Sequence, residues 1–147
     1  MGERTERSVL NHLIETCKDG ERGFVLAADH VTDPLMRVAF LEAAEQRQRF
    51  ADALRPHAQR LGGDPDTGGT MAGTLHRGWM TLKDALTRYD EAGILAEAER
   101  GEQAAAVAYD DALNSVLAPA TRGVVEAQYA DILKMRGRIH ALVSVRG

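Results

Sequence analysis

The residue best placed to do chemistry is a glutamate in the middle of an amphipathic helical segment. Apolar and small side chains recur at helical spacing between Ile94 and Val116, and Glu102 fills the gap in that stripe. A carboxylate on a buried face is costly unless a cation pairs with it, a proton neutralises it or a metal binds it. A second acid, Glu21, interrupts the apolar stripe of the first predicted helix in the same way. The group that neutralises or binds these two carboxylates therefore decides much of the function.

A metal is one group that such acids could meet. Di-metal sites in ferritin-like bundles take a Glu from each of two helices and a Glu-x-x-His pair from each of the other two. In this chain Glu99 adds a second acid three residues before Glu102. Gln48 and Tyr129 stand where the two histidines would be expected, so the set is incomplete and no catalytic residue can be assigned. The candidate ligands for iron or manganese are Glu21, Glu45, Glu99, Glu102 and Glu126.

A metal-free polar core is the other interpretation. Gln46 or Arg47 occupies the centre of the apolar stripe of the second predicted helix, and Arg136 fills a gap in the stripe of the last one. Either arginine could neutralise Glu21 or Glu102 from a facing helix. A buried pair of this kind adds little net stability, although removing one partner costs about 3–5 kcal/mol. Partial exposure of the acids is a third alternative.

The apolar periodicity and the turn signals predict helices and no strands. Asp33 is a good N-cap, and Pro34 suits the first position of the helix that follows. Gly62–Gly63 should end that helix, and Pro119 should begin the last one. Pro56 should kink the second helix or split off its last turn. The predicted helices span about 6–29, 34–61, 71–88, 91–116 and 119–143.

These helices are expected to form one all-α domain over residues 1–147. Two antiparallel hairpins joined by a long crossover predict a ferritin-like four-helix bundle, and the crossover contains the short extra helix at 71–88. The simplest role of Trp79 is to anchor this short helix to the bundle. A functional site at His76 is the less favoured alternative.

The two predicted hairpins resemble each other weakly. An offset of 81 residues lays Glu21 on Glu102 and Glu45 on Glu126. The turn prolines are 85 residues apart instead, which leaves the register of the last helix open by about one turn. The repeat predicts that Glu21 and Glu102 face each other across the bundle.

Composition restricts the class of function. The chain has 147 residues, of which 44% are hydrophobic and 27% charged, which is typical of a folded domain. The net charge of −4, without a basic cluster, argues against nucleic acid as a partner. The single cysteine, Cys17, cannot form an internal disulfide and is best explained as a core residue, which fits a cytoplasmic protein. No signal peptide or membrane-spanning segment is visible.

The resemblance of this chain to a known family rests on four segments, which are Val9–Glu21, Leu61–Pro65, Leu75–Trp79 and Glu99–Glu102. They resemble a bacterial family of ferritin-like four-helix-bundle proteins that carry a domain of unknown function. The resemblance covers about residues 7–142, and its more specific motifs are His-Arg-Gly-Trp and Glu-Arg-Gly-Glu. It implies a ferritin-like bundle, distantly similar to rubrerythrins, and no assigned activity.

The preferred functional expectation is a ferritin-like bundle of unknown biochemical function, with a structural or binding role related to stress. It would act through self-association into a homo-oligomer or through a protein partner that the sequence does not identify. The alternative is a carboxylate-bridged di-metal protein of iron or manganese that oxidises iron(II) or reduces peroxide. Neither nucleic acid nor a membrane is expected as a partner.

Overall fold

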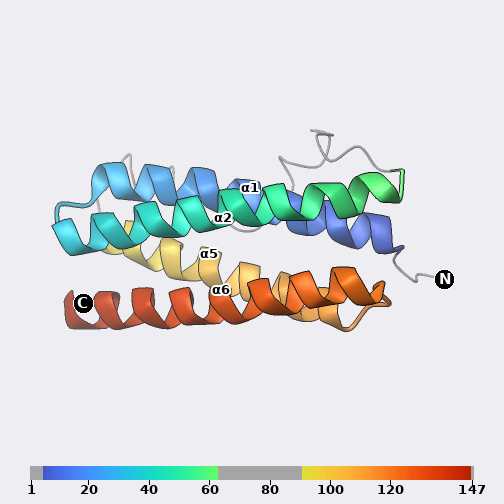
Figure 1. The fold of residues 1–147 in the computed structure, drawn as a ribbon. Coiled ribbons are helices and arrows are strands. Elements are labelled where there is room, and N and C mark those ends of the chain that lie inside the picture. The colour runs from blue at the N-terminus through green and yellow to red at the C-terminus, as the bar shows by residue number, and fades with distance from the viewer. Residues whose placement is uncertain (1–4, 63–90, 147) are drawn as a thin grey trace.

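The computed structural model describes residues 5–62 and 91–146, and these residues form four α-helices and no strands. The helices are α1 (Glu6–His30), α2 (Pro34–Arg60), α5 (Glu91–Leu113) and α6 (Pro119–Arg146) (Figure 1). Their ends differ from the predicted ends by at most three residues. The predicted helix at 71–88, with His76 and Trp79, lies outside the described residues.

Local side chains cap the first two helices. Thr5 caps α1, since its hydroxyl accepts a hydrogen bond from the Ser8 amide 3.1 Å away. Asp33 caps α2 as the sequence predicts. Its carboxylate accepts from the amides of Leu35 and Met36, at 2.8 and 3.2 Å. The start of α2 is therefore specified by a few adjacent residues.

Pro56 does not end the second helix. α2 continues through Pro56 to Arg60, so of the two predicted alternatives, a kink or a separate last turn, the separate last turn was wrong. Leu54 and Ala58, on either side of the proline, are fully buried, and their packing holds the last turn in place. Gly62 follows the helix with a φ of 81°, a left-handed conformation that glycine adopts without steric cost.

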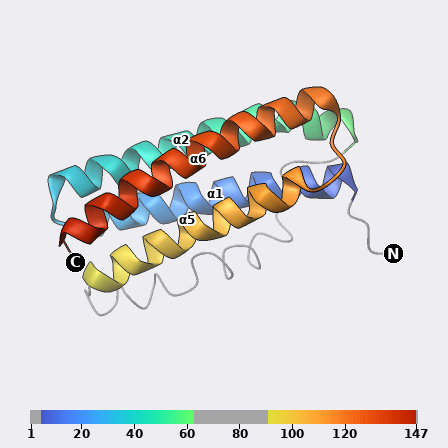
Figure 2. The same ribbon diagram turned by 90° about the horizontal axis from the view of Figure 1, so that it is seen from below.

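The helices form two antiparallel hairpins that pack side by side (Figures 1 and 2). α1 lies beside α5 and α2 lies beside α6. At one end of the α1–α5 pair, Glu6 accepts from the Ala118 amide at 2.9 Å; at the other, Thr32 donates to Glu91 at 3.3 Å. As a result α2 and α5 run in the same direction (Figure 2).

The apolar core has two parts. One contains Leu10 and Leu54, and the other contains Phe40 and Ile94. The largest fully buried side chain in the described part of the chain, Arg47, lies between them in sequence along α2. A polar layer therefore crosses the middle of the bundle. Among the described helices, none combines the length and apolar composition needed to cross a membrane.

Candidate functional site

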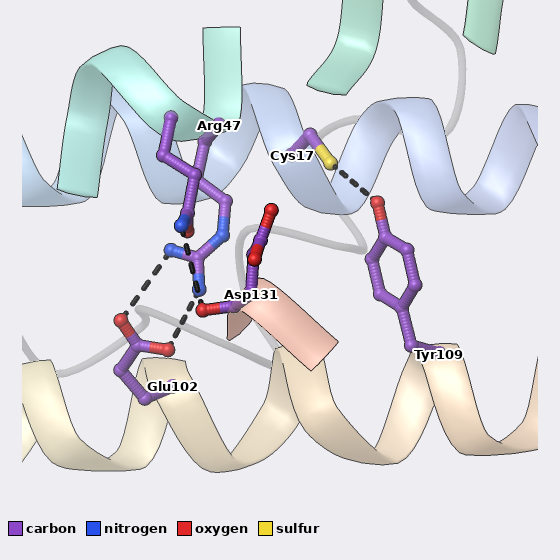
Figure 3. A network of polar contacts seen from close by, with 6 residues as sticks. Cys17, Arg47, Glu102, Tyr109 and Asp131 are labelled. Atoms are coloured by element: carbon purple, nitrogen blue, oxygen red, sulfur yellow. Dashed lines mark hydrogen bonds and ion pairs between the residues drawn. The ribbon is translucent and has the colours of Figure 1, made fainter. Parts of the chain in front are cut away.

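The polar layer is centred on an ion pair between α2 and α5. Arg47 and Glu102 have side chains that are only 2% and 1% exposed. The two guanidinium NH groups of Arg47 donate to the two carboxylate oxygens of Glu102, at 2.7 and 3.4 Å (Figure 3). This bidentate contact belongs to the strong class of charged hydrogen bonds, and the 2.7 Å bond is the stronger of the two. It confirms that Glu102 lies on a buried face and that one of the two arginines suggested by the sequence meets it.

Helix α1 provides the space for the arginine. A Cβ placed on Gly20 would lie 3.3 Å from the Arg47 Cγ, which is tighter than ordinary van der Waals contact. One turn further along α1, the Phe24 ring centroid lies 5.5 Å from the guanidinium carbon, in reach of a cation–π interaction. Gly20 and Phe24 together fix the path of Arg47 across the bundle.

Burial and charge act against each other at Glu102. Burial raises the pKa of its carboxyl, because the ionised form loses its hydration. The nearby charge of Arg47 and its hydrogen bonds, and then the charge of Arg136, oppose that rise in pKa. The ionised form of Glu102 in the core therefore depends mainly on Arg47.

A second chain of buried polar groups joins all four described helices. The Tyr109 hydroxyl donates to the Gln128 side-chain oxygen at 2.7 Å, and the Gln128 amide donates to the Phe50 carbonyl at 3.3 Å. Since the single tyrosine proton goes to Gln128, the Cys17 thiol, 3.2 Å from the hydroxyl, is the donor in that contact (Figure 3). Burial is the main reason that the pKa of Cys17 is raised to about 11 and that of Tyr109 well above its usual value. Cys17 is thus an un-ionised core thiol, as expected.

A groove that Glu102 also lines lies between α5 and α6. Its volume is about 410 Å³. Glu99 and His140 meet in it, with 2.7 Å between the Glu99 carboxylate and the His140 Nδ1. Arg136 also lines the groove and is exposed. The polar groups along the groove are Glu99, Glu102, Gln103, Arg136 and His140.

A family model for a domain of unknown function, DUF2383, matches residues 5–115. The chain belongs to the DUF2383 family. No curated protein matches the chain. The DUF2383 match includes both partners of the buried ion pair, Arg47 and Glu102, whereas Arg136 and His140 of the groove lie beyond its end.

The structure distributes the five candidate metal ligands of this DUF2383 chain over different surroundings. Glu99 and Glu102 line the same groove. Glu45 is exposed and lies 3.6 Å from Arg49 on its own helix. Glu126 is likewise exposed, 4.0 Å from Arg122. Among residues 5–62 and 91–146, no three His, Cys, Asp or Glu side chains gather in a group that could hold a metal ion.

The prediction for Glu21 needs a correction. Glu21 is half-buried, and Gly20 takes the buried position between Cys17 and Phe24 on α1. The prediction that this acid interrupts the core stripe was therefore wrong by one residue. The physical reason is Arg47, because its stem fills the space that a side chain on the buried line would need.

Sequence reasoning missed three buried acids in the described part of the chain, Glu15, Asp19 and Glu97. The side chains of Asp19 and Glu97 are 3% and 1% exposed, and each pairs with an arginine three residues later, Arg22 and Arg100. That spacing was the available signal, since residues three apart share a helix face. Gln128 and His140 had no such signal, because each bonds to a residue of another helix that is distant in sequence.

Proposed function

We propose that this DUF2383 chain is a ferritin-like bundle that works as a binding protein, with a small ligand held in the groove between α5 and α6. The ferritin-like topology is supported by the common direction of α2 and α5. Two consecutive parallel helices in a bundle need a long connection that returns along it, which is the ferritin-like arrangement.

The observation that carries the binding role is the groove itself. At about 410 Å³ it falls within the range of about 300–1,000 Å³ that is usual for small-ligand sites. Leu133 contributes apolar surface, while Arg136 and His140 contribute polar groups that could orient a ligand. A mixture of apolar wall and a few polar groups is typical of such sites.

The alternative function is a carboxylate-bridged di-metal protein that oxidises iron(II) or reduces peroxide. One observation favours it, since Glu99 and Glu102 are three residues apart on α5 and line one groove with His140. Two observations oppose it. Arg47 bonds to both oxygens of Glu102, and Glu45 and Glu126 are exposed on other helices. The residues therefore do not fit a di-metal site supplied by four helices.

An NMR fragment screen tests the binding role. The ¹⁵N-labelled protein is titrated with a varied collection of small neutral, acidic and basic compounds. We expect at least one compound to shift the amide signals of residues 99–103 and 133–140 together, because these two segments form the groove. Saturating shifts elsewhere, or none anywhere in the collection, would overturn the proposal.

Elemental mass spectrometry tests the alternative. Protein purified without a histidine tag is analysed before and after loading with iron(II) in air. Near-stoichiometric iron or manganese that is lost in the Glu99→Gln/Glu102→Gln double variant would support the di-metal function. Glu45→Gln is the matched control, because it removes an exposed candidate that lies outside the groove.

A further inference from the structure

We infer that the ligand of the groove is a small organic anion, and that Arg136 is the group that binds its charge. The ligand class is a carboxylate with a short apolar chain. This inference rests on the proposed binding role of the groove and adds the chemistry of its occupant.

The hydrogen bonding of the charged groups in the groove favours an anion. Both of its carboxylates are already bonded, Glu102 to Arg47 and Glu99 to His140. Arg136 differs from them. Among the described residues it has no salt-bridge partner, although its charge favours the ionised form of Glu102. The group left to attract a ligand is therefore a guanidinium, whose planar fork matches a carboxylate.

The histidine offers a second polar contact. A carboxylate only accepts hydrogen bonds, so the His140 Nδ1 must carry a proton to bond to Glu99 at 2.7 Å. The Glu99 contact thereby fixes the tautomer of His140 when the ring is neutral. Its Nε2 is then an acceptor for a hydroxyl or an amide of a ligand, and Arg136, four residues earlier on α6, lies on the same face of the helix.

The apolar part of the ligand has a matching surface. Leu133 is 39% exposed and lines the groove, whereas Ile139, which also borders the groove, is fully buried. Gly137 lies between them along α6, and a Cβ placed on it would have no heavy atom within 4 Å. The open space at Gly137 is where a short hydrocarbon chain would lie. A side chain introduced there would occupy the ligand's volume without striking the protein.

The test uses three probes with the same six-carbon chain, namely hexanoate, hexylamine and 1-hexanol. Binding is followed by amide NMR shifts and by calorimetry in low-salt buffer. We expect hexanoate to bind in the groove and hexylamine not to bind. The Arg136→Gln variant should bind hexanoate about tenfold more weakly or worse, because bonds to a charged donor are lost. Lys134→Gln, which removes an exposed charge of α6 outside the groove, should leave affinity unchanged.

A second pair of variants tests the apolar part. Gly137→Leu should abolish hexanoate binding without lowering the melting temperature, while Gly123→Leu, at an equally open position of α6 outside the groove, should bind normally. Added sodium chloride should weaken hexanoate binding, since the attraction is between charges.

Each other outcome overturns the inference in a distinguishable way. Equal binding of hexylamine or hexanol, or full binding of hexanoate by Arg136→Gln, would refute the anion while the groove remained a ligand site. If none of the three six-carbon probes shifted the amide signals of the groove, the inference of an anionic ligand would also be refuted. The proposed function would fail as well only if no compound of the fragment collection shifted the amide signals of the groove.

Discussion

At the scale of single residues, the most consequential contact is the pair of Arg47 and Glu102. Two opposite charges in a core contribute little net stability, because each has lost its hydration. The loss of one partner is much more damaging, because the other remains buried and unpaired.

Arg47→Met should destabilise the protein by about 3–5 kcal/mol near neutral pH. Without Arg47, burial raises the folded-state pKa of Glu102 further above its unfolded value. A raised folded pKa gives stability that is present below the unfolded pKa and is lost as pH rises through the folded pKa. The defect should therefore be smaller at about pH 5 than at about pH 8, as urea unfolding would show.

The matched control is Arg47→Met/Glu102→Met, which leaves no buried charge. It should recover most of the stability and lose the pH dependence. An equal defect of the single variant at both pH values would show that Glu102 does not take up the proton.

Gly20→Ala should destabilise the protein even though alanine favours helices. The new Cβ would lie 3.3 Å from the Arg47 Cγ, and the two hydrogen bonds to Glu102 limit how far Arg47 can move. We expect a net loss of about 1 kcal/mol, because crowding outweighs a helix-propensity gain of similar size. Gly123→Ala, where the Cβ meets nothing within 4 Å, should stabilise by about 0.5–1 kcal/mol. Thermal unfolding of both variants tests this expectation. If both substitutions stabilised the protein, the Arg47 side chain would have to move away from the new Cβ.

Cys17 should resist thiol reagents in the folded protein. It is fully buried, and its pKa of about 11 leaves little thiolate at pH values near 8. Labelling with a chromogenic disulfide should follow global unfolding and accelerate sharply in denaturant. Fast stoichiometric labelling without denaturant would show that the α1–α5 contact opens locally.

At the scale of helices, the chain of hydrogen bonds through Tyr109 holds α5 to its neighbours. Tyr109→Phe would leave the Gln128 oxygen buried without this donor, at a cost of about 1–3 kcal/mol. Tyr129→Phe is the control, since Tyr129 is only half-buried and packs at the edge of the core, so its effect should be within about 0.5 kcal/mol. Chemical unfolding of both variants compares the costs, and equal effects would mean that the hydroxyl of Tyr109 contributes nothing.

At the scale of the whole molecule, buried polar contacts join the two hairpins to each other. Arg47 connects α2 to α5, and Gln128 connects α6 to α2. We therefore expect the hairpins to unfold together. Scanning calorimetry should show one transition, with equal calorimetric and van't Hoff enthalpies. Two resolved transitions would show that the hairpins are separate cooperative units.

Local sequence signals were enough for the helices but not for the site. Caps such as Asp33 and the spacing of apolar residues act within a few residues, so the four described helices were predicted closely. The choice of Arg47 as partner for Glu102, and the shift of the buried line from Glu21 to Gly20, depend on how each helix is rotated. That rotation is set by packing between helices, which a single sequence does not reveal.

The contacts within the groove were even harder to predict from local sequence patterns than the buried ion pair. Glu99 and His140 are brought together by the pairing of two whole helices, and no spacing within either helix predicts it. The interpretation of Trp79 as an anchor stays a prediction, since that residue lies outside the described ranges.

The ion pair also determines how the α1–α2 hairpin is aligned along the α5–α6 hairpin. Much of the buried face of α5 is alanine, at positions 98, 105, 106, 108 and 112. Such a smooth face would accept α1, which packs beside α5, after the first hairpin is displaced by one helical turn, about 5.4 Å, with similar apolar contact. That displacement would separate Arg47 from Glu102 and leave two unpaired charges in the core. One pair of charges thus selects a single alignment of the two hairpins along their length. The alanines alone would allow more than one alignment.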